Sequence, residues 1–404
     1  MKIILPDDVS TIINKLTENG YEAYAVGGCV RDSILCREPG DWDITTSAKP
    51  EQVKALFRRT IDTGIAHGTV TIMMGRTGYE VTTYRVDGEY EDNRHPKNVE
   101  FTPLLSEDLK RRDFTINAMA YNDKDGIVDL FDGSGDIGRK LIRCVGNPAE
   151  RFGEDALRIL RAVRFSAQLG FDIEENTCEA ISKLAPTLAN ISKERIHTEL
   201  GKLLLSPNPD FINRAYELGI TEVVCPAYDN ISDKKTVLKL LKLTQPLIPF
   251  RYAAVFIENT AEQAEKALKE LKLDNNTIAR VSNIVKHHGL QLPAEEVGIR
   301  RLINAVGYDK VGDVVEFETT FAISVGDITR QGELMAMKQL INLIKDRGDC
   351  VDNKGLAITG KDLIEKGMTP GKEIGNALHH CIELVLERPE CNTREILLHE
   401  LNIE

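Results

Sequence analysis

The hydrophobic pattern of the chain changes near residue 141, and this change restricts the folds that the sequence can adopt. Before it, strand-like segments such as HGTVTIMMG (67–75) and YEVTTYRV (79–86) alternate with helical segments such as KPEQVKALF (49–57). After it, the pattern is helical almost throughout, as in GEDALRILRAVRFSAQLG (153–170) and KERIHTELGKLLL (193–205). The sequence therefore predicts an α+β multidomain protein, with a mixed head followed by an all-α remainder.

Length, charge and cysteine usage limit the class of protein. The 404 residues exceed one ordinary core, so we expect two to four domains. The chain has no apolar run of membrane-spanning length, its first residues do not resemble a signal peptide, and its eight cysteines are scattered, so we expect a cytoplasmic protein with reduced thiols and no membrane partner. The net charge of −12 argues against a general nucleic-acid binder, but residues 139–164 hold seven basic residues against three acidic ones. A polyanion site is expected there.

Two aspartates one residue apart, in GDWDIT (40–45), are the first candidate site. Side chains at positions i and i+2 of a strand point to the same side, so we expect Asp41 and Asp43 to lie together, either at a metal ion or in a solvated turn. Gly27 and Gly28 precede them at a strand-to-helix turn, where backbone amides could approach a phosphate, and Arg31 follows. This combination within seventeen residues favours Mg²⁺ bridging substrate phosphates.

Further candidates follow on later segments. Glu80, in YEVTTYR, is a third carboxylate for an in-line displacement at phosphorus, or else an ordinary exposed strand position. The segment RRDFTINA is either a solvated helix start or a group that neutralises a triphosphate. Its candidate residues are Arg111, Arg112, Asp113 and Asn117.

Asp155 and Arg158 are three residues apart on a predicted helix, so we expect them to be neighbours on one face. Such a pair is commonly an intrahelical salt bridge. However, cytosine and adenine each present an amino donor beside a ring-nitrogen acceptor, which an aspartate and an arginine complement, whereas guanine and uracil present the reverse order. The pair is therefore a candidate for selecting C and A, with Arg161 and Arg164 extending the positive surface.

Several segments in succession resemble one family. AVGGCVRD, GDWDITT, LKRRDFTINAMA, EDALRILRAVRF, KERIHTELGKLLL and ITGKDLIEKGMTPGKEIG resemble the motifs of class II tRNA nucleotidyltransferases, the bacterial-type CCA-adding enzymes. The resemblance implies a polymerase-β-like catalytic head (1–140), a helical neck that recognises the base (141–205), a helical body (206–270) and a helical tail that binds tRNA (271–404).

The resemblance also implies an activity. Asp41 and Asp43 would hold Mg²⁺ while the tRNA 3′-hydroxyl attacks the α-phosphate of CTP or ATP and pyrophosphate leaves. Carried over by motif, the nucleotide-binding residues would be Gly28, Arg31, Arg112, Asp155, Arg158, Arg161 and Arg164.

Three alternatives stay open at this point: an enzyme that adds only A or only CC, a poly(A) polymerase, and a degenerate RNA-binding protein without activity. The segment VDGEYEDNRHPKNVEF (86–101) bears on the first, because its alternating charges predict either a passive connection or a mobile loop. In the family, this region resembles a loop kept by enzymes that add A, with Arg94 a candidate for remodelling the pocket for ATP. Outside these motifs, we expect KHHG (286–289) to be a solvated helix end and Trp42 to serve packing.

Overall fold

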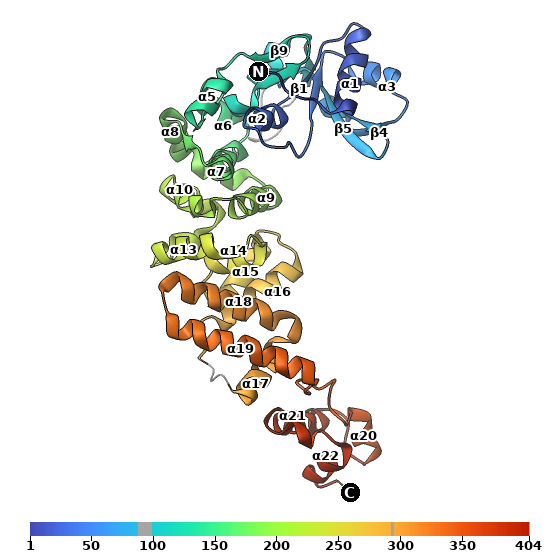
Figure 1. Cartoon of the computed structure of the whole chain (residues 1–404), viewed down its shortest axis with the longest axis vertical. Coiled ribbons are helices and arrows are strands. Elements are labelled where there is room, and N and C mark those ends of the chain that lie inside the picture. Colours follow the sequence, from blue (N-terminus) through green and yellow to red (C-terminus); the bar gives the residue numbers. More distant parts are fainter. Residues whose placement is uncertain (88–98, 292–294, 404) are drawn as a thin grey trace. The chain divides into compact units, whose positions relative to one another are not determined.

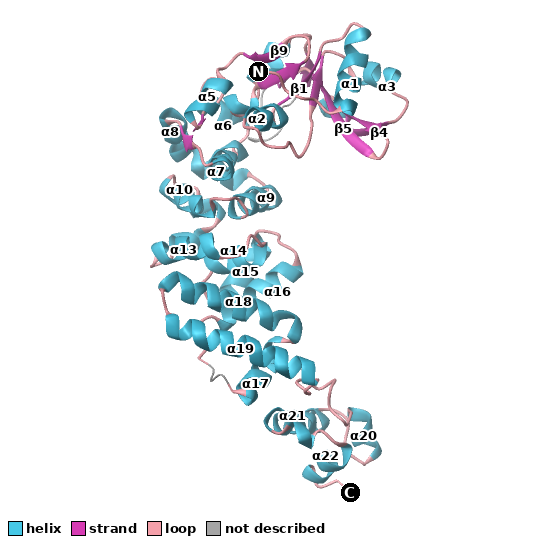
Figure 2. Cartoon of the chain, viewed as in Figure 1, coloured by secondary structure: helices cyan, strands magenta, loops and turns pink. Residues whose placement is uncertain are grey.

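The computed structural model describes residues 1–87, 99–291 and 295–403 of the chain. The chain divides into two compact units, residues 1–230 and 231–404, which are described separately (Figure 1). All strands of the described residues belong to the first unit, whereas the described part of the second is built from helices (Figure 2). The predicted α+β organisation, with a mixed head and a largely helical remainder, is confirmed.

A seven-stranded mixed sheet forms the head of the first unit. Strand β1 is buried along its whole length and pairs antiparallel with both β2 and β8, while β2 pairs parallel with β5. This arrangement brings the turn after β1 and the segment before β2 to one end of the sheet centre. In spatial order the strands are β3 (Thr60–Gly64), β4 (Thr69–Met74), β5 (Thr77–Thr83), β2 (Ile44–Thr46), β1 (Ala23–Val26), β8 (Met119–Asn122) and β9 (Gly126–Asp129).

Helices pack against this sheet through apolar residues at helical spacing. In α1, Val9, Ile12, Ile13 and Leu16 are all buried, and they recur every three or four residues. The helices of the head are α1 (Asp7–Glu18), α2 (Gly28–Ile34), α3 (Pro50–Leu56), α4 (Leu105–Lys110) and α5 (Gly133–Arg139). Two-stranded pairs are formed by β6 (Arg85–Asp87) with β7 (Val99–Phe101) and by β10 (Leu141–Ile142) with β11 (Asp172–Ile173).

The first unit continues as helices, and here two local predictions were wrong. The helix expected over 153–170 is interrupted, because Asp155 is extended (φ −138°, ψ 103°) between α6 and α7. The strand expected to carry Asp41 and Asp43 is limited to Ile44–Thr46, so both aspartates precede it in an irregular segment. The helices are α6 (Pro148–Glu154), α7 (Leu157–Leu169), α8 (Glu175–Leu184), α9 (Lys193–Leu204), α10 (Ile212–Glu217), α11 (Thr221–Val224) and α12 (Pro226–Asp229).

The described part of the second unit is a set of helices around its own apolar core, which includes Ile299, Ile344 and Val385. Within the described residues, no helix is both long and apolar enough to cross a membrane. The helices are α13 (Lys234–Leu243), α14 (Ile248–Val255), α15 (Ala261–Glu270), α16 (Asn275–His287), α17 (Glu296–Val306), α18 (Tyr308–Val325), α19 (Ile328–Arg347), α20 (Gly360–Glu365), α21 (Lys372–Glu387) and α22 (Arg394–Glu400).

The KHHG segment ends a helix, as expected, but it is not a solvated end. His287 is buried, and Nδ1 of His288 lies 2.6 Å from Glu318 Oε1. Phe321 packs edge-on against the His288 ring at a centroid distance of 4.5 Å. His288 therefore belongs to the packing of α16 against α18, whereas the buried His287 bonds the Asn283 carbonyl of its own helix.

Candidate active site

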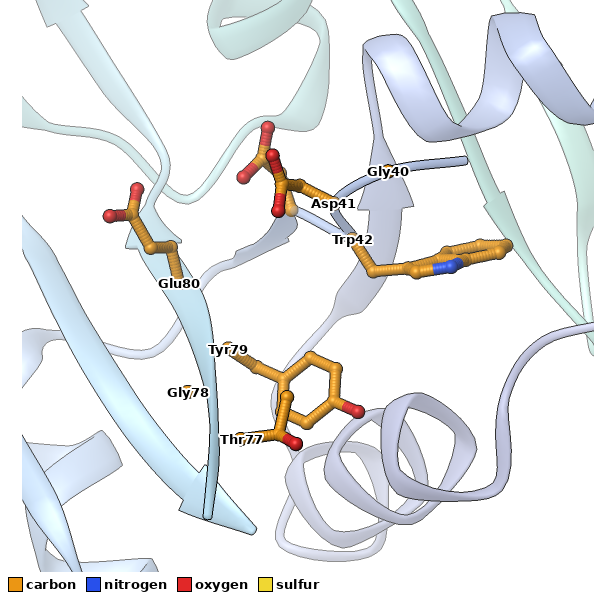
Figure 3. A pocket seen from close by; sticks show the side chains of 8 residues that line it. Gly40, Asp41, Trp42, Thr77, Gly78, Tyr79 and Glu80 are labelled. Carbon is orange, nitrogen blue, oxygen red and sulfur yellow. The ribbon is translucent and has the colours of Figure 1, made fainter. Parts of the chain in front are cut away.

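A cavity of about 440 Å³ lies between the segment before β2 and strand β5 (Figure 3). The parallel register of β2 with β5 begins at Ile44 paired with Val81, and Asp43 and Glu80 directly precede these two residues. Figure 3 shows the carboxylates of Asp41 and Glu80 extending toward the same space, whereas the Trp42 ring extends away from it. The eight lining residues are Gly40, Asp41, Trp42, Asp43, Thr77, Gly78, Tyr79 and Glu80.

The three carboxylates repel one another in this cavity. Loss of hydration raises the pKa of Asp43 above its usual range, the Arg112 guanidinium opposes that shift, and the Glu80 and Asp41 carboxylates add to it. Within the described part of the chain, none of the three carboxylates forms an ion pair. A cation placed between them would therefore lower the free energy of the ionised form.

The donor set suits a metal that is completed by substrate. The described residues contain no cluster of three or more His, Cys, Asp or Glu side chains that could hold a metal ion. Mg²⁺, however, usually takes only one or two carboxylates and completes its shell with waters and substrate phosphates. The hard oxygens of Asp41 and Asp43 fit that partial role.

The glycine turn after β1 admits an arginine. Gly27 has φ +83°, and a Cβ at this position would lie 3.0 Å from Arg112 Nη1. Its N–H donates to the Met119 carbonyl at 3.1 Å and is therefore already occupied, so the approach of this amide to a phosphate stays a prediction. Gly28 opens α2, with Arg31 one turn further on. The turn thus brings the Arg112 guanidinium close to the start of α2.

A second cavity, of about 260 Å³, lies where the segment after α4 meets α7 and α9. It unites motifs more than forty residues apart in the sequence. Its lining residues are Arg111, Arg112, Asp113, Asp155, Leu157, Arg158, Arg161 and Arg195. Arg112 both lines this cavity and acts electrostatically on Asp43, so it connects the second cavity to the carboxylate cavity.

Asp155 and Arg158 both line this cavity, but they are not paired as the helix prediction suggested. The Asp155 carboxylate accepts two bonds from Arg195, at 2.7 and 3.3 Å, and one from the Leu157 N–H at 3.0 Å. Arg158 pairs with Glu154 at 2.6 Å and donates to the Arg111 carbonyl at 2.9 Å. The two side chains thus have separate ion-pair partners.

Asp113 lies between two arginines of the site. Its Oδ2 accepts bonds from Arg161 at 2.6 and 2.9 Å, and Asn117 donates to its Oδ1 at 3.1 Å. Asn117 in turn accepts a bond from Arg31 at 2.7 Å. Burial raises the pKa of Asp113, but Arg161 and the hydrogen bonds outweigh it and hold the pKa at about 2.

Arg31, Asn117 and Arg164 are not among the residues that line the two cavities. Arg31 is buried and pairs with its neighbour Asp32 at 2.9 Å. Arg164 is buried and pairs with Glu199 of α9. Most arginines of the predicted basic stretch 139–164 are likewise paired with carboxylates: Arg139 and Arg143 with Asp136, Arg151 and Arg158 with Glu154, and Arg161 with Asp113.

Sequence reasoning missed Arg195, Glu199 and Asp108. Glu199 falls at the apolar spacing of α9 with Ile196 and Leu203, and a buried acid at such a position requires a cationic partner. That spacing was the available signal for Glu199, with Arg195 one turn before it. Asp108 is fully buried and bonds both Arg111 and Arg112, so it fixes the start of the RRD segment.

Three stretches of the chain match known protein families. Residues 23–143 match the Poly A polymerase head domain, and residues 252–401 match the tRNA nucleotidyltransferase domain 2 family. Residues 170–231 match the family described as "Probable RNA and SrmB- binding site of polymerase A". These matches lie in both units of the chain.

Similar proteins extend over nearly the whole chain. The CCA-adding enzyme of Limosilactobacillus reuteri (strain DSM 20016) is 38% identical over 399 residues, or 96% of this chain and 94% of that protein. The CCA-adding enzyme of Limosilactobacillus fermentum is 39% identical over 396 residues, or 96% of this chain and 94% of that protein.

Solved structures are similar as well. The Bacillus stearothermophilus CCA-adding enzyme in complex with CTP aligns with a TM-score of 0.78 and 33% identity, covering 99% of this chain and 98% of that one. The Thermotoga maritima CCA-adding enzyme complexed with tRNA-CCA, at 23% identity and a TM-score of 0.62, shows the same fold over 100% of this chain and 99% of that one.

Proposed function

Because the chain belongs to the family of CCA-adding enzymes, which are tRNA nucleotidyltransferases, we propose that it adds C, C and A to the 3′ end of tRNA from CTP and ATP without a nucleic-acid template. One observation carries this proposal beyond the family: a carboxylate cavity and an Asp–Arg cavity lie in one unit, and Arg112 connects them. A nucleoside triphosphate needs both, since its phosphates react and its base must be recognised.

The carboxylate cavity would carry the chemistry. Asp41 and Asp43 would hold Mg²⁺, which when bound supplies charge stabilisation at the transferred phosphoryl group. The tRNA 3′-hydroxyl releases its proton to solvent as its oxygen forms a bond to the α-phosphorus. The bond between that phosphorus and the α,β-bridging oxygen breaks, and its electron pair leaves with pyrophosphate. Glu80, which lines the same cavity as Asp43 and acts on it electrostatically, would be the third carboxylate for this in-line displacement.

The arginines near the second cavity would neutralise the triphosphate. Arg111 and Arg112 share the buried Asp108, at 2.7 and 3.4 Å, which holds both guanidinium groups near the cavity. Arg112 lines the cavity, and its buried Nε has no hydrogen-bond partner among the described residues, so the hydrogen-bonding capacity of this guanidinium is not filled by the protein. A chain of hydrogen bonds would help to hold these arginines in place. It joins Arg31, Asn117, Asp113 and Arg161.

The base would be read by Asp155 and Arg158. An ionised carboxylate offers about four acceptor sites. Arg195 and the Leu157 N–H occupy three of them on Asp155, so one is left for the amino group of cytosine or adenine. Arg158, on the same cavity wall, would donate to the adjacent ring nitrogen. Guanine and uracil would place a carbonyl against the carboxylate and be rejected.

Three finer assignments belong to the same proposal. The division into head, neck, body and tail at 140/141, 205/206 and 270/271 follows from the family resemblance and is finer than the two compact units. Dependence on Mg²⁺ in particular follows from the hard oxygen donors of the cavity. A cytoplasmic location follows from a tRNA substrate and from eight cysteines that are all free.

To test the proposal, the protein is incubated with Mg²⁺, a tRNA that lacks CCA, and each nucleotide in turn. The products are then resolved to one nucleotide. Full CCA addition requires two residues from CTP and then one from ATP. Addition of A only to tRNA ending in CC, arrest after CC, or long A tails on any RNA would each identify a different enzyme. No product with any nucleotide would identify an inactive RNA-binding protein.

A further inference from the structure

The ring of Phe165, on α7, has three guanidinium groups around it. The Cζ atom of Arg164 lies 3.7 Å from the ring centroid, and those of Arg31 and Arg161 each lie 5.2 Å from it. The other cation that lies over an aromatic ring in the described part of the chain is Lys15, over Phe57. Phe165 thus differs from an ordinary core phenylalanine in what surrounds it.

Three cations gathered at one ring repel each other. Each is paired with a carboxylate: Arg31 with Asp32, Arg161 with Asp113, and Arg164 with Glu199, which Arg161 also approaches at 3.8 Å. Burial lowers the pKa of Arg164, Glu199 raises it, and the charge of Arg161 lowers it further, which reflects the repulsion between the two guanidinium groups. The negative π-face of an aromatic ring attracts cations, so it offsets part of this repulsion.

The ring also closes a chain of hydrogen bonds that ends in the second cavity. Arg31 donates to Asn117, Asn117 donates to Asp113, and Asp113 accepts from Arg161. Asp113 and Arg161 line the cavity, while Arg31 comes from α2 of the head. Both ends of the chain, Arg31 and Arg161, meet at Phe165.

We propose that Phe165 is a positioning residue for nucleotide binding, which holds Arg31 and Arg161 at fixed places through its π-face. It does not line either cavity and is only 7% exposed, so it acts through the arginines and not on the nucleotide. The inference rests on the proposed function, because its readout is the binding of CTP and ATP.

The competing explanation is plain packing. Phe165 also meets Phe114 edge to face, at a centroid distance of 5.8 Å, and any apolar side chain of similar volume would serve that contact. Packing and positioning predict different results when leucine replaces Phe165. Leucine restores the apolar contact, but it has no π-face to hold the guanidinium groups.

The test compares Phe165→Leu and Phe165→Tyr with the unchanged protein, measuring KM and kcat for CTP and ATP together with the urea midpoint. Loss of the cation–π contacts of Arg31 and Arg161 predicts a KM about 5- to 30-fold higher in Phe165→Leu, with a much smaller change in kcat. Phe165→Tyr keeps a π-face and should restore KM. Phe171→Leu is the matched control, since Phe171 is also buried, lies just after α7 and has no guanidinium group over its ring among the described residues.

A second series keeps the test informative if leucine unfolds the protein. Phenylalanine at 165 carrying one to five fluorine atoms nearly conserves shape while weakening the π-face, so KM should rise stepwise with fluorine number. A flat series, or a normal KM in a folded Phe165→Leu, overturns the positioning role while CCA addition by the unchanged protein still stands. Failure of the unchanged protein to extend tRNA would instead overturn the proposed function.

Discussion

Replacing Arg195 with methionine should impair base selection without removing catalysis. Arg195 holds both oxygens of Asp155 from α9, whereas Asp155 would meet the base. Methionine keeps much of the apolar stem but removes the charge and the fork of donors. The Asp155 carboxylate then loses the partner that fixes its orientation and keeps only the bond from the Leu157 N–H.

The magnitude follows from burial and geometry. The side chains of Arg195 and Asp155 are 27% and 19% exposed, so the pair lies between a surface bridge, about 0.2–1 kcal/mol, and a fully buried one, about 3–5 kcal/mol on truncation. We expect a stability loss of about 1–2 kcal/mol. A loss of similar size in base contacts corresponds to about 5- to 30-fold in kcat/KM for CTP and ATP.

The chain offers a close control in Arg280. It pairs with Asp313 through two bonds, at 2.6 and 3.0 Å, and these side chains are 29% and 19% exposed. Arg280→Met should therefore cost similar stability while leaving the preference among the four nucleotides unchanged, because neither Arg280 nor Asp313 lines the cavity of Asp155.

The assay measures kcat/KM for CTP, ATP, UTP and GTP with tRNA acceptors, alongside urea unfolding of both variants. Arg195→Met should narrow the preference for C and A over U and G, whereas Arg280→Met should not. The two substitutions could lower stability equally while Arg195→Met keeps its full preference for C and A over U and G. That result would refute the idea that Arg195 orients Asp155 for base reading.

Three further predictions concern other parts of the first unit. Asp41→Ala or Asp43→Ala should reduce nucleotide incorporation by several orders of magnitude with an undiminished melting temperature; near-normal turnover in either variant would exclude a metal role. Asp113 has its pKa held at about 2, below an ordinary value of about 3.9, so its stabilising effect is present above about pH 4 and is lost as pH falls toward 2. In Asp113→Asn, the free energy of unfolding measured in urea should therefore fall by about 2 kcal/mol less between pH 4 and pH 2 than in the unchanged protein. The same pH dependence in both proteins would contradict the pairing with Arg161. Deleting residues 89–97, which lie outside the described residues, should leave CC addition intact and stop the product one nucleotide short. A product that still ends in A would show that this segment is not needed for adding A.

Local patterns in the sequence were enough to predict many elements. The proline that opens α3 and the β-branched run of β4 each depend on near neighbours, and both elements lie close to where they were expected. The carboxylate pair and Glu80 were also found from residue type and strand context, and the structure places them around one cavity. Their roles in catalysis stay predictions.

Helix continuity at Asp155 was predicted wrongly for a local reason. The segment 153–170 has a helical apolar period, which hides a break in the backbone. An aspartate side chain can compete for backbone N–H groups, and here the Asp155 carboxylate accepts from the Leu157 N–H just before α7. As a result Asp155 and Arg158 are not neighbours on one helix face.

The sequence by itself determined which charged groups this protein has and which local elements carry them. Only the tertiary structure decided which charges meet: Asp155 with Arg195, Asp113 with Arg161, and both in one cavity with Arg112. The partners in these ion pairs are 40 and 48 residues apart, so no periodicity along the chain encodes them. They arise because packing of α7 and α9 removes charged side chains from water, and a buried charge is stable only where packing also supplies its partner.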